Sequence, residues 1–216
     1  MELDLIPVSA AKRVANRTIA NRLIAMRRDA AFFDGDRQNG YGGYVYDGRQ
    51  AETARRFCEH YSLDNASSVM QVQCEKGFLL YEFLQLNPLM RVRGTENSIY
   101  ALSEAIRRVG SMRFAQPTEN PFKDKEFDLV IALGVVYALT LTDAVKCLQE
   151  TERVGRHGYV TLAAYETLAD LELFRRWTLL GTTILKRDEW LEVMRHAGYR
   201  GDYSFVTAHT LGLCES

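Results

Sequence analysis

Val69-Met-Gln-Val-Gln-Cys-Glu-Lys-Gly77 is the stretch that decides the fold of this 216-residue chain. Its apolar residues Val69, Met70 and Val72 predict a short buried strand, and Gly77 precedes an apolar run that predicts a helix over residues 78–86. A strand that turns through a tight loop into a helix forms a ligand cradle, because the loop amides and the helix N-terminus point beyond the carboxyl end of the strand. We therefore expect a binding site at this loop.

Strand and helix patterns alternate on both sides of this loop. Expected strands cover residues 69–72, 90–95, 112–115, 129–133, 159–164, 203–207 and 211–214, and expected helices cover residues 52–61, 78–86, 98–109, 142–154, 167–177 and 187–197. The continuous apolar run of residues 129–133 is typical of a central parallel strand that is covered on both faces. The alternation predicts an α/β protein with a Rossmann-like, doubly wound, mostly parallel seven-stranded sheet.

The N-terminal part reads as a helical and lid annex, residues 1–62, attached to an α/β domain of residues 63–216. Residues 1–28 carry a net charge of +4. Ser9 is a candidate cap for a helix whose apolar stripe comprises Ala15, Ile19, Leu23 and Met26. This helix could present a basic surface to an anionic partner or membrane, or it could pack on the body with a solvated charged face.

Residues 32–49 combine five glycines with the aromatic residues Phe32, Phe33, Tyr41, Tyr44 and Tyr46. Glycine gives conformational freedom and aromatic rings give flat contact area, which together suit a lid over a pocket. The alternative is a loop whose rings pack into the core. Two arginines beside these rings, Arg37 and Arg49, are candidates to hold an anionic substrate.

Composition narrows the function classes. The chain is 47% hydrophobic and 25% charged, as in ordinary folded proteins, and its net charge of −1 gives no field that would recruit nucleic acid. No apolar run approaches the roughly 20 residues of a membrane span. The first residues lack the pattern of a secretion signal. The four cysteines have no paired spacing, so we expect no metal site, no disulfide and a cytoplasmic location.

Glu96 follows the second expected strand, 19 positions after Gly77. An acidic residue at this place in a βαβ unit can accept hydrogen bonds from both ribose hydroxyls of an adenosine ligand. The alternative is an exposed glutamate at a strand end.

Several motifs in order resemble the class I S-adenosylmethionine-dependent methyltransferases, over roughly residues 67–199, and in particular their ubiquinone-type, small-molecule branch. After the first motif and Gly94-Thr-Glu-Asn-Ser98, the similar segments are Pro121-Phe-Lys-Asp-Lys-Glu-Phe-Asp-Leu-Val-Ile131, Glu150-Thr-Glu-Arg-Val-Gly-Arg-His-Gly158 and Arg187-Asp-Glu-Trp-Leu-Glu-Val-Met-Arg-His-Ala-Gly-Tyr199. The first motif is degenerate. Gln71 replaces the usual acid, Gln73 and Glu75 replace two glycines, and Gln116-Pro117 replaces the usual adenine-contacting pair.

The resemblance implies S-adenosylmethionine as cofactor and a set of residues around it. The implied cofactor-binding residues are Gln73, Cys74, Gly77, Glu96, Asn97, Gln116, Pro117, Leu133 and Gly134. A loop that cradles a pyrophosphate does not suit a carboxylate, so Glu75 argues against NAD and favours the phosphate-free methyl donor.

Methyl transfer to a small-molecule acceptor is thus the predicted function, with a small molecule as the expected partner and neither nucleic acid nor membrane. Tyr137, just after the fourth strand, is the candidate catalytic residue, either as a base or as part of the pocket lining. Arg37, Tyr41, Tyr44 and Tyr46 are the candidate substrate and lid residues. The alternatives are a catalytically retired methyltransferase fold that serves as a binding or partner protein, and a nucleotide-dependent oxidoreductase.

Overall fold

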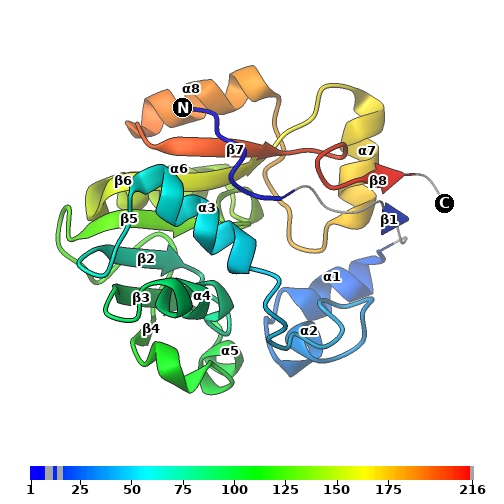
Figure 1. Ribbon diagram of the computed structural model, residues 1–216. Coiled ribbons are helices and arrows are strands. Elements are labelled where there is room, and N and C mark those ends of the chain that lie inside the picture. Colours follow the sequence, from blue (N-terminus) through cyan, green and yellow to red (C-terminus); the bar gives the residue numbers. More distant parts are fainter. Residues whose placement is uncertain (8–11, 14–16, 215–216) are drawn as a thin grey trace.

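A six-stranded parallel sheet forms the centre of the protein (Figure 1), seen in a computed structural model that describes residues 1–7, 12–13 and 17–214. The strand order is β4-β3-β2-β5-β6-β7, and each neighbouring pair is parallel. The strands are β2 (Ser68–Val72), β3 (Arg91–Glu96), β4 (Met112–Phe114), β5 (Phe127–Ala132), β6 (Gly155–Ala163) and β7 (Asp202–Val206). The predicted Rossmann-like α/β architecture is confirmed.

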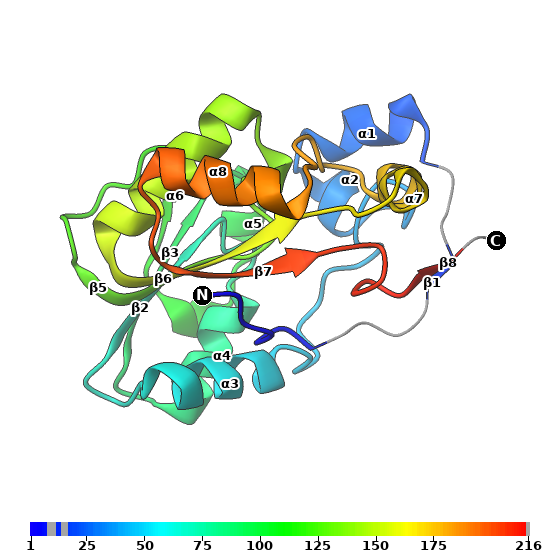
Figure 2. The ribbon, with the colours of Figure 1, turned by 90° about the horizontal axis from the view of Figure 1, so that it is seen from above.

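Helices cover both faces of the sheet (Figure 2). The helices are α1 (Ile19–Ala25), α2 (Ala30–Phe33), α3 (Ala51–Tyr61), α4 (Phe78–Leu86), α5 (Ile99–Ser103), α6 (Leu141–Val154), α7 (Leu168–Trp177) and α8 (Arg187–Ala197), with 3-10 turns η1 (Arg107–Val109) and η2 (Val136–Ala138). One apolar cluster joins α3 and α4 to one face through Phe57 and Phe83, and another joins α6 and α8 to the opposite face through Leu148 and Trp190.

The register of the central strands brings their carboxyl ends to one edge. Val69 of β2 pairs with both Val92 of β3 and Leu129 of β5, so the loops that follow these three strands lie side by side. All five residues of β2 are buried, as expected for a strand covered on both faces. The α1–α2 segment and α7 also lie toward this edge (Figure 1).

The expected seventh strand of the sheet is wrong. Residues 207–212 turn after β7, where the Leu211 amide donates to the Thr207 carbonyl, and Leu213 then packs against α7. The next two residues form β8 (Leu213–Cys214), which pairs with β1 (Lys12–Arg13) in a separate two-stranded sheet. The outer edge of β7 is covered by the N-terminus, because the Leu3 amide donates to Tyr203 and the Tyr203 amide donates to Met1.

Two helix predictions also need correction. Ser9 and Ala15 lie outside the described residues, and the helix there begins after a Thr18 cap. Its apolar residues Ile19, Leu23 and Met26 are exposed instead of packing on the body.

The helix expected over residues 98–109 ends at Ser103. The Ile106 amide then donates to the Lys76 carbonyl, which ties this segment to the loop after β2. The boundary at residue 62 remains a prediction, although α3, on its N-terminal side, packs against α4.

Gly94 on β3 is the closest approach between that strand and the first loop. A Cβ there would lie 2.4 Å from the Cys74 Sγ. We expect Gly94→Ala to lower the free energy of unfolding by about 1–3 kcal/mol, the usual range for overpacking, as measured by urea unfolding. Cys74→Ala should recover part of this loss in the double variant, and an equal loss with and without Cys74 would contradict the contact.

Candidate functional site

The loop after β2 keeps a glycine-like path although it lacks two glycines. Gln73 and Glu75 have φ angles of 51° and 55°, and Gly77 has a φ of 81°. Left-handed backbone costs a residue with a side chain about 1 kcal/mol or more. The loop is held in this path by β3, because the Cys74 amide donates to the Thr95 carbonyl at 2.9 Å.

The side chain of Gln73 reaches across the end of β3. Its amide nitrogen donates to the Ala115 carbonyl at 3.4 Å, and its amide oxygen accepts from the Asn97 amide at 3.5 Å. Both bonds are long, and the side chain is buried. Nearby, the Asn97 side chain donates to the Gln116 side-chain oxygen at 3.2 Å. Asn97 and Gln116 are therefore paired at the edge where the adenine was expected.

Glu96 is fully buried at the end of β3 and is surrounded by donors, so the exposed-glutamate alternative is wrong. The backbone amides of Glu75 and Ser98 each donate to one of its carboxylate oxygens at 2.8 Å. The Arg28 Nη2 lies 3.1 Å from both oxygens. The Arg28 guanidinium therefore donates to the same two carboxylate oxygens that would accept hydrogen bonds from the two ribose hydroxyls.

Arg28 is held firmly in this place. It has a φ of 48°, its carbonyl accepts from the Ser98 hydroxyl, and its guanidinium lies 5.7 Å from the Phe32 ring centroid and 5.6 Å from that of Phe33. Burial alone would lower the pKa of Arg28, but the carboxylates of Glu96 and Glu75 outweigh it and raise the pKa. Arg28 is therefore a permanent cation at the first loop.

Glu75 lies within a layer of tyrosines. Its carboxylate accepts from the Tyr41 hydroxyl, and burial raises its pKa although Arg28 and the tyrosine hydroxyls oppose the shift. Tyr41 stacks on Tyr44 with ring centroids 4.3 Å apart, and Tyr44 stacks on Phe78 at 4.7 Å. The aromatic rings of the predicted lid thus form a packed layer over the start of α4.

Lys76 fixes this layer to α4. Its Nζ lies 2.6 Å from the Asp34 carboxylate and donates to the Tyr44 carbonyl at 2.9 Å. The Asp34 carboxylate also accepts from the Tyr44 amide at 2.9 Å. The loop from α2 to Tyr44 is therefore joined by charge and hydrogen bonds to the same loop that carries Gln73 and Glu75.

A cavity of about 560 Å³ opens beside this loop and the end of β5. Its polar wall includes Glu75, Tyr137 and four arginines, and its apolar wall comes from α1 and its C-cap, from the segment after β5 and from the end of α7. The four arginines are Arg17, Arg22, Arg28 and Arg37. Its volume suits a small organic ligand.

The predicted site residues divide into two groups. Those that line the cavity are Gln73, Asn97, Pro117, Leu133, Gly134, Tyr137, Arg37 and Tyr41. Those behind or beside it are Cys74, Gly77, Glu96, Gln116, Tyr44 and Tyr46. Arg49 pairs with Asp47 at the surface instead of facing the cavity.

Burial and Glu75 raise the pKa of Tyr137 to about 12. This phenol therefore stays protonated near neutrality, which disfavours the base role and leaves Tyr137 as a hydrogen-bond donor in the cavity.

Sequence reasoning missed Arg28, Arg17 and Arg22 as site residues. The only available signal was the basic character of residues 1–28, which does not reveal which arginine turns inward. The sequence identified Glu75 as a replaced glycine and as an argument against a phosphate ligand, but not as a carboxylate on the cavity wall.

The expected cofactor can be tested against these groups. Glu96 and the amide pair Asn97–Gln116 are suitable partners for a ribose and an adenine. Arg28, however, already donates to both Glu96 oxygens, and Gln73 extends across the end of β3. The residues fit S-adenosylmethionine in kind, provided that the Arg28 guanidinium leaves Glu96.

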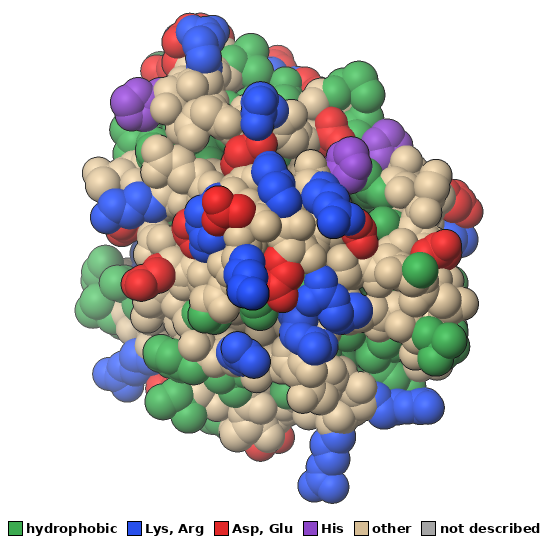
Figure 3. Space-filling model, turned by 90° about the vertical axis from the view of Figure 1, so that its left-hand side faces the viewer, with side chains coloured by type: hydrophobic (Ala, Val, Ile, Leu, Met, Phe, Trp, Pro, Cys, Tyr) green, Lys and Arg blue, Asp and Glu red, His purple; other side chains and the backbone are tan. Residues whose placement is uncertain are grey.

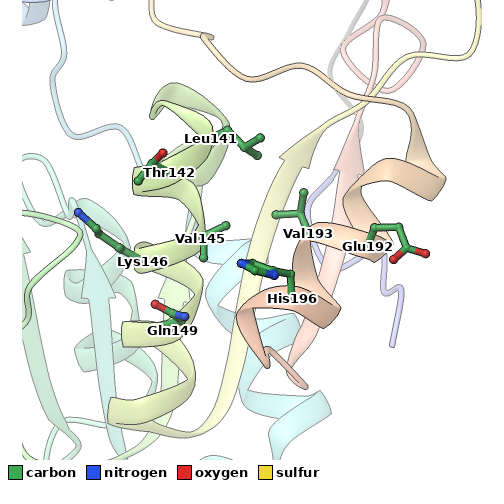
Figure 4. Close-up of a pocket in the computed structure, with 8 residues that line it drawn as sticks. All are labelled: Leu141, Thr142, Val145, Lys146, Gln149, Glu192, Val193 and His196. Atoms are coloured by element: carbon green, nitrogen blue, oxygen red, sulfur yellow. The ribbon is translucent and has the colours of Figure 1, made fainter.

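A second hollow, of about 640 Å³, lies between α6 and α8 (Figure 4). It is lined by Leu141, Thr142, Val145, Lys146, Gln149, Glu192, Val193 and His196. No predicted site residue lines this hollow, and none of its lining residues belongs to the loops after β2 and β3. Within the described residues, no acidic, histidine and cysteine side chains gather into a metal site, and no helix is long and apolar enough to cross a membrane.

Comparisons with known proteins agree on the fold. Residues 70–162 match the methyltransferase domain family. The chain resembles the YcgJ protein of Bacillus subtilis (14% identity, TM-score 0.56, 67% of this chain and 66% of that chain, which is just under two thirds of its length).

Two further structures are similar. A putative methyltransferase of Bacillus halodurans shares 16% identity (TM-score 0.54, 67% of this chain and 68% of that chain). The [4+2]-cyclase SpnF shares 18% identity (TM-score 0.57, 89% and 74%). No curated protein sequence matches the chain. At these identities the structures support the fold alone.

Glu75 gives the site a testable pH dependence. Because its pKa is raised in the folded protein, the folded state binds the proton more tightly than the unfolded chain does. Stability owed to this group therefore falls as the pH rises from the ordinary carboxylate range through the raised pKa. We expect Glu75→Gln to gain stability relative to the wild type between pH 4 and pH 8, on the order of 1 kcal/mol, in urea unfolding at each pH. The exposed Glu119→Gln is the control, and parallel pH curves for Glu75→Gln and wild type would contradict this account.

Proposed function

We propose that the chain is a class I S-adenosylmethionine-dependent methyltransferase and that it methylates a small-molecule acceptor bound in the cavity beside β5. The observation that carries the proposal is Glu96, a fully buried carboxylate at the end of β3 whose orientation is set by two backbone amides of the cofactor loop. The adjoining cavity of about 560 Å³ supports an acceptor of small size.

S-adenosylmethionine supplies an activated methyl group, so the protein can act mainly by positioning and by excluding water. Glu96 orients the ribose, Asn97 and Gln116 offer amide groups to the adenine, and Gly134 leaves room at the end of β5. Tyr137 donates a hydrogen bond to the acceptor. Glu75, the carboxylate on the cavity wall with the raised pKa, is better suited than Tyr137 to take a proton from an acceptor.

In this proposal the Arg28–Glu96 pair competes with the cofactor. The guanidinium and the ribose hydroxyls need the same carboxylate oxygens, so binding requires a state in which Arg28 has moved into the cavity. When only a fraction of molecules is in such a state, the apparent affinity falls by that fraction. A reducing, cytoplasmic location is part of the same proposal, since Cys58, Cys74 and Cys147 are not joined in disulfides.

The second candidate is a retired enzyme that keeps the fold as a binding protein. It is favoured by the same ion pair, since Arg28 and Gln73 fill the nucleoside half of the site with the chain's own side chains. One structural neighbour with this fold is a cyclase by name, and a fold alone does not fix the chemistry. An oxidoreductase finds no such support, because Glu75 places a carboxylate in the loop at residues 73–77, where a pyrophosphate would bind.

Calorimetric titration separates the two candidates. We expect wild-type protein to bind S-adenosylmethionine weakly, and Arg28→Ala to bind it about tenfold more tightly, or roughly 1.4 kcal/mol, because the competitor is gone. Arg27→Ala is the matched control, since this neighbouring arginine is exposed. Titration with NAD should give no heat of binding with the wild type or with either variant.

Arg28→Ala also leaves Glu96 without its charge partner, which for a buried pair costs on the order of 3–5 kcal/mol of stability, so Arg28→Gln serves as a milder second variant. Absence of binding by wild type and both Arg28 variants would favour the retired enzyme. Weaker binding by Arg28→Ala than by wild type, with the fold intact, would show that Arg28 assists the cofactor and does not compete with it.

A further inference from the structure

Three arginines of the cavity wall have no carboxylate partner. Arg17 lies just before α1, Arg22 is on α1, and Arg37 is in the loop after α2. Among the residues that the structure describes, none of the three forms an ion pair, and the fourth arginine, Arg28, is engaged by Glu96. The cavity therefore carries an excess of positive charge.

Backbone carbonyls hold these guanidinium groups in place. Arg17 Nη1 donates to the Arg37 carbonyl at 2.8 Å and also to the Gln38 carbonyl, Arg37 Nη1 donates to the Gly40 carbonyl, and Arg22 donates to the Arg175 carbonyl. A carbonyl fixes the direction of an arginine without neutralising its charge. The side chains are thus oriented in advance, and their charge remains available to a ligand.

Arg17 shows the cost of this arrangement. Its Nε is buried and has no hydrogen-bond partner, which is costly for a charged group. Burial and then the charge of Arg37 lower the pKa of Arg17, and Asp36 only partly opposes them. The repulsion between these like charges, which Asp36 only partly offsets, is relieved when an anion binds.

Several arginines elsewhere on the protein are paired with carboxylates. On the side where the strands of the sheet begin, Lys and Arg alternate with Asp and Glu (Figure 3). There Arg156 pairs with Asp128 at 2.6 Å, and Arg91 pairs with Glu126 at 3.0 Å. The three cavity arginines differ from these pairs, because their printed partners are backbone carbonyls and not carboxylates.

Beside the arginines, the wall has a polar part that includes Glu75 and Tyr137 and an apolar part. Ile19 and Met26 are 72% and 68% exposed, yet both face the cavity, and Trp177, Leu179 and Leu180 line it from the segment at the end of α7. A ligand that satisfies both walls has an anionic group beside an apolar body.

We propose that the cavity binds a small oxyanion ester, with a phosphate group held by Arg17, Arg22 and Arg37 and an apolar body against α1 and the end of α7. This inference rests on the proposed function, because it names the class of the acceptor in the same cavity. Guanidinium groups match phosphate oxygens in geometry as well as in charge.

The test uses phenyl phosphate as probe, phenol as its neutral counterpart, and the full chain without S-adenosylmethionine. Binding is followed by the fluorescence of Trp177, which lines the cavity. We expect phenyl phosphate to bind at least tenfold more tightly than phenol, and expect its affinity to fall as salt is added. The double variant Arg22→Gln/Arg37→Gln should lose at least tenfold in affinity for phenyl phosphate and little for phenol.

Arg156→Ala is the matched control, because it removes an arginine that is paired far from the cavity. The melting temperature of each variant verifies that it is folded. If the double variant does not fold, the single variant Arg37→Gln replaces it. Equal affinities for phenyl phosphate and phenol, or equal losses in Arg156→Ala and the cavity variants, would overturn the proposal. The phenyl phosphate assay contains no cofactor, so it tests the anion site independently of methyl transfer. If the protein binds phenyl phosphate but never binds S-adenosylmethionine, the anion site is upheld and the methyl-transfer proposal fails.

Discussion

The ion pair between Arg28 and Glu96 connects the N-terminal elements to the carboxyl end of the sheet. Glu96 is fully buried, so its charge is tolerable only because two backbone amides and a guanidinium surround it. The same contacts orient the loop after β2 and the start of α5. In the proposed function the ribose of the cofactor needs the same carboxylate that organises these three segments.

The altered first loop keeps its backbone path. Gln73 and Glu75 keep the left-handed backbone that glycine normally provides, so the loop retains its path while its side chains fill the adjoining space. Gln73 spans the end of β3, and Glu75 accepts from Tyr41 in the aromatic layer. The substitutions thus change what occupies the site and leave the architecture around it unaltered.

The pattern of apolar residues was enough to predict most of the sheet and its helices. The helix over residues 78–86 agrees with α4, and a helix that ends at Gly198 is found as α8. Periodicity reports local burial, so it could not reveal that Leu213 turns away from the sheet or that residues 1–3 cover the edge of β7.

Less of the candidate site than of the fold could be predicted from the sequence. The position of Glu96 at the end of a strand followed from its spacing after the first loop, whereas the positive φ of Gln73 is a structural finding. Arg28 lies 68 positions before Glu96 in the chain, and no local pattern distinguishes it from the exposed Arg27 beside it. Neither expected role of the α1 stripe, a basic surface for a partner or packing on the body, included lining a cavity, yet Ile19 and Met26 do so.

A crystal structure of the protein with S-adenosylhomocysteine, the demethylated product of the cofactor, tests the central claim most directly. The account predicts the ribose of this ligand on Glu96, with the Arg28 guanidinium displaced into the cavity and the path of residues 73–77 unchanged. A structure at saturating ligand in which Arg28 stays on Glu96, with the ligand elsewhere or absent, would contradict it.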